Sequence, residues 1–277
     1  MGTFSIVDEG DISPGHKSIN CCMPFKIKKD VDGNTLEYRA RCNADGRQQD
    51  VRSYGDTFAP TSKFSCIRSM CAIEAQEGLT LYQFDMKGAF LLAAECKERI
   101  YINLPGKYRL IKGKVLQCRR LIYGLKQAAH GWNQMLVKWL LNYVFINVSN
   151  NGVTFVKNVK KDDGSVSKIL LSIRVDDGLE ACSDEAMYKD FIIAMSRDFD
   201  LSDSRKLKWF LGGKVEQDRE KGIVWLSQEQ YCNDVLKRFQ MSDCMPVDTP
   251  CEANLHLAAS DSPPLDKRDA DMVHNYQ

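Results

Sequence analysis

The stretch Ile169-Leu-Leu-Ser-Ile-Arg-Val-Asp-Asp-Gly178 does most to decide the fold, because an apolar segment runs directly into two carboxylates. We expect a strand over 169–175 that ends in Asp176-Asp177-Gly178. Neighbouring residues on a regular strand point to opposite faces of the sheet. Asp176 and Asp177 can therefore approach one site only at a tight turn, which Gly178 permits.

A second apolar segment, over 79–84, is predicted to form a strand that runs into Asp85 in the same way. Carboxylates gathered from both strands would repel one another unless cations lay between them, and hard oxygen ligands suit Mg²⁺ better than zinc. A two-metal phosphoryl-transfer site needs such ligands, since one ion activates an attacking hydroxyl and the other neutralises the leaving oxygens. The residues alone leave an alternative open, in which Asp176-Asp177-Gly178 is an ordinary turn and Asp85 simply ends a strand.

Composition narrows the class of protein. The chain has 277 residues, enough for one large or two modest domains, and its net charge of +1 argues against a surface that coats nucleic acid or acidic membrane everywhere. Eleven cysteines without a C-x-x-C pair fit a reducing compartment, and four scattered histidines give little support to a zinc site. No apolar stretch approaches the ~20 residues that cross a bilayer, so we expect no membrane partner.

Charge is unevenly distributed along this neutral chain. Residues 97–138 hold ten basic side chains and one acid, interleaved with aromatic residues, as in a groove that follows a polyanionic strand. A solvated basic face whose aromatics belong to the core explains the same pattern. Residues 243–277 carry seven acids and four prolines, which predicts a linker or tail.

The remaining patterns are mixed α and β. We expect hairpins built from 25–28 with 36–42 and from 209–217 with 223–226. Helices are predicted over 61–77 with Gly78 as its stop, over 127–145, from 184 with Ser183 as its N-cap, and from a capping box at 227–230 through Phe239.

The order of these segments resembles the reverse transcriptase domain of copia-type retrotransposon polyproteins. Asp56-Thr-Phe-Ala-Pro60 is similar to E-T-F-A-P, and Phe84-Asp-Met-Lys-Gly-Ala-Phe-Leu91 is similar to L-D-V-K-x-A-F-L. Leu121-Ile-Tyr-Gly-Leu-Lys-Gln-Ala128 resembles L-Y-G-L-K-Q-A, and Val175-Asp-Asp177 resembles the Y-V-D-D box. Further blocks follow in the family's order at Phe210-Leu-Gly212, Leu226-Ser-Gln-Glu-Gln-Tyr231, Lys237-Arg-Phe239 and Thr249-Pro250.

The resemblance implies an RNA-directed DNA polymerase that transfers nucleotides from a dNTP to a primer 3′-hydroxyl. Asp85 and Asp176 would be the principal ligands of two Mg²⁺ ions, with Mn²⁺ as the alternative, and Asp177 a weaker third ligand. Phe90 would lie beneath the incoming sugar and exclude a 2′-hydroxyl. Arg41 would clamp the triphosphate, since guanidinium matches phosphate geometry. For Phe90 an ordinary core aromatic, and for Arg41 an exposed strand arginine, is the alternative.

Other matched residues would contact substrate or nucleic acid. Gly124, Lys126 and Gln127 would flank the nucleotide and template, with the glycine permitting close backbone approach. The basic block would belong to the fingers that hold the template, with Arg119 and Arg120 among its contacts. Implied partners are an RNA template, a DNA primer and dNTPs, together with RNase H and integrase parts of a polyprotein. The implied location is cytoplasmic, in a virus-like particle for an intact element, with the nucleus as the alternative.

Several positions depart from the family pattern. Arg174, also counted among the nucleic-acid contacts, stands where the Y-V-D-D box has tyrosine, and Asp45 stands where the family carries a positive charge. These changes favour a second hypothesis: a catalytically degenerate remnant that at most binds nucleic acid.

The implied fold is α+β, a right-hand polymerase. We expect fingers and a palm over 1–250 as a single unit, with an antiparallel palm sheet backed by helices and the thumb largely missing. Residues 251–277 are predicted to be an acidic, proline-containing, poorly ordered tail.

Overall fold

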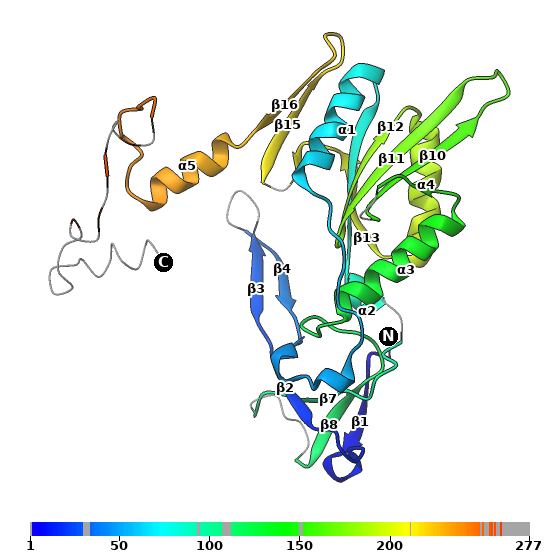
Figure 1. Cartoon of the computed structure of the whole chain (residues 1–277), viewed down its shortest axis with the longest axis vertical. Coiled ribbons are helices and arrows are strands. Elements are labelled where there is room, and N and C mark those ends of the chain that lie inside the picture. The colour runs from blue at the N-terminus through cyan, green and yellow to red at the C-terminus, as the bar shows by residue number, and fades with distance from the viewer. Residues whose placement is uncertain are drawn as a thin grey trace. The chain divides into compact units, whose positions relative to one another are not determined.

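The structure is a computed structural model (Figure 1). It describes residues 2–29, 34–92, 95–106, 112–149, 152–210, 212–249, 251, 255–256, 258 and 261. The chain divides into two compact units, one of Met1–Leu207 with Asp218–Ile223 and one of Lys208–Gln217 with Val224–Gln277. No helix in the described part is long and apolar enough to cross a membrane.

A six-stranded sheet forms the centre of the first unit. Its strands lie in the order β13-β6-β12-β11-β10-β9, and all neighbours are antiparallel. The bounds are β6 (Thr80–Met86), β9 (Ile146–Asn147), β10 (Thr154–Lys160), β11 (Val166–Arg174), β12 (Asp177–Cys182) and β13 (Leu201–Lys206). Both strands predicted to end at carboxylates, β6 and β11, lie in this sheet with β12 between them.

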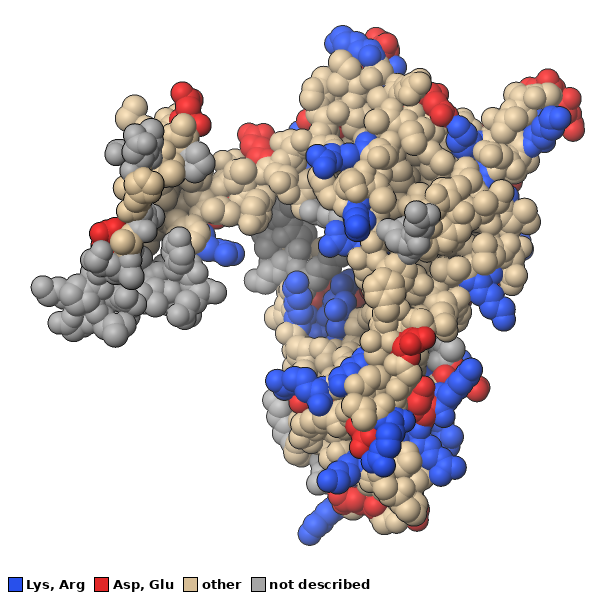
Figure 2. Space-filling view, in the orientation of Figure 1, with Lys and Arg blue, Asp and Glu red and all other residues tan. Residues whose placement is uncertain are grey.

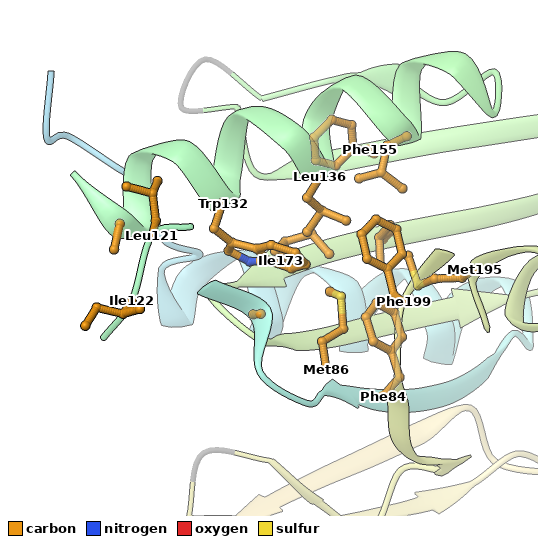
Figure 3. Close-up of a cluster of buried hydrophobic side chains, with 14 of the residues drawn as sticks. Phe84, Met86, Leu121, Ile122, Trp132, Leu136, Phe155, Ile173, Met195 and Phe199 are labelled. Carbon is orange, nitrogen blue, oxygen red and sulfur yellow. The ribbon is translucent and has the colours of Figure 1, made fainter. Parts of the chain in front are cut away.

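Helices cover both faces of this sheet. Helix α1 (Phe64–Glu77) packs on β6, β11 and β12, while α4 (Glu185–Asp198) packs on β11, β12 and β13. The main core lies on the α4 side, where α3 (Ala128–Asn142) contributes Trp132 and Leu136 against side chains of β6 and β11 (Figure 3). The predicted antiparallel sheet backed by helices is therefore present.

A second sheet and a separate hairpin complete the first unit. The second sheet has the order β1-β8-β7-β2-β5, with β2 and β7 parallel and the other neighbours antiparallel. Its strands are β1 (Phe4–Asp8), β2 (Ser18–Cys22), β5 (Asn43–Ala44), β7 (Tyr101–Asn103) and β8 (Lys114–Cys118). The predicted N-terminal hairpin is confirmed as β3 (Phe25–Lys29) paired with β4 (Thr35–Ala40).

Short elements connect these parts. They are the 3₁₀ turns η1 (Glu9–Asp11), η2 (Gly46–Gln48) and η3 (Val51–Ser53), and the one-turn helix α2 (Ala89–Leu92). In the second unit, the predicted hairpin is confirmed in a three-stranded sheet, β14 (Trp209–Phe210), β15 (Gly213–Asp218) and β16 (Ile223–Ser227), followed by α5 (Glu229–Arg238). Most of the predicted tail, residues 251–277, lies outside the described residues.

Helix ends differ from the predictions in informative ways. The N-cap of α4 is Asp184, not Ser183, because the Asp184 carboxylate accepts hydrogen bonds from the amides of Ala186 (2.8 Å) and Met187 (3.4 Å). The capping box at 227–230 does not form. Gln228 is the N-cap of α5 without a side-chain bond, and the Gln230 amide instead donates to Asp234.

Two helices end through left-handed residues. Gly78 ends α1 with φ 65° and returns its amide to the carbonyl of Glu74, as predicted. Helix α3 ends at Asn142, earlier than the predicted 145, and Val144 follows with φ 67°.

Candidate active site

Asp85 and Asp177 lie directly opposite each other on neighbouring strands. Asp85 is near the end of β6, Asp177 begins β12, and the two residues are backbone partners in the antiparallel register. Opposed residues in such a pair project their side chains to the same face, so both carboxylates lie on one side of the sheet. Both side chains are half-buried.

The tight turn that carries the third carboxylate consists of Val175 and Asp176. Arg174 and Asp177 are the last paired residues of β11 and β12, so the two residues between them reverse the chain. Val175 has φ 58°, a left-handed conformation that a β-branched residue rarely adopts. The prediction that Gly178 supplies the backbone freedom for this turn is therefore wrong.

Gly178 instead lies inside β12, opposite Phe84 and Ile173. A Cβ at this position would stand 2.1 Å from the Phe84 ring. Glycine is therefore needed here for the close packing of an aromatic ring against the strand, next to the carboxylates, and not for the turn.

Two hydrogen bonds hold the turn in place. The indole Nε1 of Trp132, a residue of α3 with only 1% of its surface exposed, donates to the carbonyl of Val175 at 2.8 Å. The amide of Met86 donates to the carbonyl of Asp176 at 2.9 Å. The strained turn is thus fixed from the helix on one side and from the end of β6 on the other.

Burial and neighbouring carboxylates raise the pKa of two of these groups, Asp176 and Asp177. Burial, and then the charges of Asp177 and Asp85, raise the pKa of Asp176 to about 6, while Arg41 opposes the shift. Burial and Asp85 also raise the pKa of Asp177, against the lowering effect of Arg174. Each shift marks a carboxylate whose negative charge is poorly compensated by its surroundings.

This donor set has the chemistry of a divalent cation site. Carboxylate oxygens on adjacent strands and an adjoining turn are hard ligands, and a cation among them would relieve the repulsion that, after burial, raises the pKa of Asp176. The described residues contain no group of three or more His, Cys, Asp and Glu side chains already arranged to hold a metal. The residues fit the ion by chemistry, without a preformed three-ligand cage.

An aromatic and cationic cluster lies next to the carboxylates. The ring of Phe90, in α2, meets the ring of Tyr123 edge to face at 4.7 Å, and the Arg41 guanidinium lies over the same Tyr123 ring at 5.0 Å. Burial and the charges of Asp176 and Asp85 raise the pKa of the Tyr123 phenol, and Arg41 lowers it. The structure thus brings the predicted Phe90 and Arg41 to one side chain close to the carboxylates.

The segment 124–127 is held by packing and by a buried glutamine. Gly124 has φ 88°, and a Cβ on it would stand 2.1 Å from the backbone oxygen of Ala44. Gln49 accepts from the amide of Lys126 (2.7 Å) and donates to the side chain of Gln127 (3.1 Å). The Lys126 ammonium donates to the Tyr54 hydroxyl at 2.9 Å.

Gln127 is 5% exposed and is engaged inside the protein. The structure therefore places it beneath the surface that Lys126 presents. Its substrate contact, like that of Gly124 and Lys126, stays a prediction.

The arginines predicted to bind nucleic acid lie at two places. Arg119 and Arg120 follow β8, where the Arg119 guanidinium donates to the Ser5 hydroxyl of β1 at 2.8 Å. Figure 2 shows Lys and Arg, with some acids among them, over the part built from β1, β2, β7 and β8. Arg174 is exposed at the end of β11, opposite Asp177. Lys107 and Arg109 of the basic block lie outside the described residues.

A family model described as reverse transcriptase (RNA-dependent DNA polymerase) matches residues 2–253. The chain belongs to the reverse transcriptase family. Among its relatives is the "Retrovirus-related Pol polyprotein from transposon TNT 1-94" of Nicotiana tabacum, which is 29% identical over 93% of this chain. Those from transposons RE2 and RE1 of Arabidopsis thaliana are 31% and 30% identical over 86% of it. These relatives support a copia-type reverse transcriptase domain.

The chain spans only 16–19% of the length of these polyproteins. A solved structure titled as a foamy viral protease-reverse transcriptase in complex with double-stranded DNA is similar with a TM-score of 0.37 and 14% identity, over 83% of this chain and 33% of that one.

Three structural contributors to this reverse transcriptase domain do not follow from the sequence reasoning. The sequence pattern indicates Trp132 as part of the apolar stripe of a helix and Tyr123 as an aromatic of the basic block. Both also match the family's L-Y-G-L-K-Q-A-P-R-x-W motif, but the sequence assigns neither of them a role at the site, and it gives no role to Gln49. Tyr123 lies in the block Leu121–Ala128, and Trp132 follows that block at the family's spacing, which is the signal that could single them out. Gln49 has no local signal, because its role depends on contacts to residues almost eighty positions away.

Proposed function

We propose that this domain is an RNA-directed DNA polymerase that extends a DNA primer on an RNA template. The observation that carries the proposal is the pairing of Asp85 with Asp177, which places two carboxylates on one face of an antiparallel sheet beside the turn that carries Asp176, whose pKa is raised. Family membership supports the reaction class. In this proposal the six-stranded sheet with its helices is the palm. The second sheet and the β3–β4 hairpin are the fingers.

Each nearby side chain has a role that its chemistry can perform. Asp85 and Asp176 would hold divalent cations, with Asp177 as a weaker donor. Bound Mg²⁺ would supply activation of the attacking 3′-hydroxyl and neutralisation of the leaving pyrophosphate. Arg41 would bind the triphosphate and orient its α-phosphate for in-line attack. Phe90 would close the space beside the sugar C2′ and so favour deoxynucleotides.

Primer extension on an RNA template with Mg²⁺ tests this function. We expect Asp176→Asn to abolish extension, because it removes a charged cation ligand. The matched control is Asp162→Asn, in the exposed turn between β10 and β11 at the other end of β11, about 30 Å away along the strand. Equal extension by wild type and Asp176→Asn would contradict the assignment of Asp176 as a cation ligand.

Arg174 favours a second candidate function, nucleic-acid binding without catalysis. It is the cross-strand partner of Asp177, and its positive charge lowers the pKa of that carboxyl, so it competes with a cation for the same ligand. A chain that shifts a primer–template at low salt, yet never extends it at any Mg²⁺ or Mn²⁺ concentration, would have this function instead.

A further inference from the structure

Tyr123 is the side chain through which the predicted sugar-selecting and phosphate-binding residues are connected. The Phe90 ring meets its ring edge to face at 4.7 Å with an interplanar angle of 80°, and the Arg41 guanidinium lies 5.0 Å from the same ring centroid. Phe90 comes from α2, whereas Arg41 follows β4. Two segments nearly fifty residues apart thus contact the same ring.

The backbone that carries this ring is held firmly. The Tyr123 carbonyl accepts a hydrogen bond from the Ala44 amide at 2.8 Å. The next residue, Gly124, packs so closely on Ala44 that a Cβ would stand 2.1 Å from its carbonyl oxygen. Tyr123 is therefore anchored to β5 of the second sheet. Its phenol lies near enough to Asp176 and Asp85 of the first sheet for their charges to act on it.

We propose that Tyr123 is a positioning residue of the nucleotide site, whose ring sets both the sugar discrimination exerted by Phe90 and the triphosphate affinity supplied by Arg41. This inference rests on the proposed polymerase function and extends it to a residue whose role is exerted through its two neighbours. An edge-to-face contact and a cation–π contact to one ring couple the two functions, so loss of the ring impairs both together.

The test compares Tyr123→Leu, which removes the ring but keeps an apolar side chain, with Tyr123→Phe, which keeps both ring contacts. We expect Tyr123→Leu to raise the KM for dNTP about tenfold and to lower the preference for dNTP over rNTP about tenfold, with a smaller change in kcat. Tyr123→Phe should stay within about twofold of wild type, because both contacts are made by the ring and not by the hydroxyl.

Tyr143→Leu is the matched control. Tyr143 is likewise half-buried, stacks on Trp139 at 5.2 Å and has the Lys157 ammonium 3.6 Å from its ring centroid, yet it packs on the core formed with α4. Loss of this ring should lower the melting temperature without changing the KM or the sugar preference. A change in sugar preference as large as that of Tyr123→Leu would show that the effect is one of general stability, and would overturn the inference.

A binding measurement separates this inference from the polymerase proposal. Equilibrium binding of dTTP and of 5-methyl-UTP, its ribonucleotide counterpart with the same base, each with Mg²⁺, is measured on protein bound to an RNA–DNA primer–template whose primer ends in a dideoxynucleotide, so that no turnover occurs. We expect the preference of wild type for dTTP to be reduced about tenfold in Tyr123→Leu and retained in Tyr123→Phe.

The outcomes are distinct. Nucleotide binding with this pattern but no extension from a normal primer refutes the polymerase function alone. Extension by wild type with an unchanged KM and unchanged sugar preference in Tyr123→Leu refutes the role of Tyr123 alone. Absence of any dTTP preference in wild type refutes it as well.

Discussion

At the scale of single residues, the least compensated group in the described part of the protein is Glu180. It lies in the middle of β12, opposite Tyr82 and Leu171, with 0% of its surface exposed. Neither carboxylate oxygen has a hydrogen-bond partner among the described residues. Burial raises the pKa of this carboxyl well above its ordinary value of 4.5. A charged or unpaired polar group in such a place destabilises the fold.

Replacement of Glu180 by leucine should therefore stabilise the domain. We expect Glu180→Leu to increase the free energy of unfolding at pH 7.5 by about 2 kcal/mol, because an apolar side chain of similar volume needs no hydrogen bond. Urea denaturation measures the change, and Glu220→Leu at an exposed position is the control. An unchanged or lower stability of Glu180→Leu would show that the site tolerates the carboxylate.

The same residue predicts a pH dependence of stability. A carboxyl whose pKa is raised on folding keeps its proton in the native state and loses it in the unfolded chain, so stability falls as pH rises above 4.5. Between that pH and the native pKa the slope is about 1.4 kcal/mol per pH unit. The stability difference between Glu180→Gln and wild type should grow with pH over this window. Urea denaturation from about pH 5 to about pH 8 measures it, and a constant difference would contradict the assignment.

Arg174 leads to a third prediction at this scale. The positive charge of Arg174 opposes a cation at Asp177. Loss of one nearby charge is worth roughly 1 kcal/mol or more at a half-buried site. We therefore expect Arg174→Tyr to lower the Mg²⁺ concentration for half-maximal primer extension about tenfold. Arg197→Tyr, on the exposed face of α4, is the control. If Arg174→Tyr does not increase extension at any Mg²⁺ concentration, the Arg174 charge does not limit cation binding.

At the scale of elements, periodicity predicted most helices and strands, and tertiary contacts decided what it could not. The apolar stripe of Trp132, Leu136 and Leu140 correctly indicated α3. That the Trp132 indole also fixes the Val175 turn depends on a contact 43 residues away, which no local pattern encodes. For the same reason the carboxylates could be predicted as strand ends, but their register across β6 and β12 could not.

Gly178 shows how a tertiary contact replaces a local explanation. The sequence indicated a turn glycine, whereas the structure gives it a packing role against Phe84, a 2% exposed ring that also meets Phe191. Gly178→Ala should lower the free energy of unfolding by about 1–3 kcal/mol, because the added methyl group overpacks a core that cannot yield. Gly10→Ala, with no atom within 4 Å of the new Cβ, should stay within about 0.5 kcal/mol. Equal effects of both substitutions in urea denaturation would contradict this role.

At the scale of the whole molecule, a net charge of +1 coexists with basic side chains that lie, with some acids among them, over β1, β2, β7 and β8 (Figure 2). Net charge alone excluded a protein that coats nucleic acid, and it could not show whether one region binds it. The family, the antiparallel sheet and its helices followed from sequence blocks spread over most of the chain. The contact between the Arg119 guanidinium and the Ser5 hydroxyl, more than a hundred residues away, required the folded arrangement.

This local charge predicts a salt dependence of nucleic-acid binding that two arginines control. Neutralising a phosphate releases counterions, so the slope of log affinity against log salt falls in magnitude by about 1 for each phosphate that the protein no longer neutralises. Replacing Arg119 and Arg120 together by serine should weaken primer–template binding and flatten the slope by about 2. The control makes the same two-charge change at Lys189 and Arg197, exposed on α4, and should leave the slope unaltered. Fluorescence anisotropy between about 50 and 300 mM salt measures the affinity and its salt dependence for both double variants. Identical slopes for the two would show that Arg119 and Arg120 do not contact the bound template.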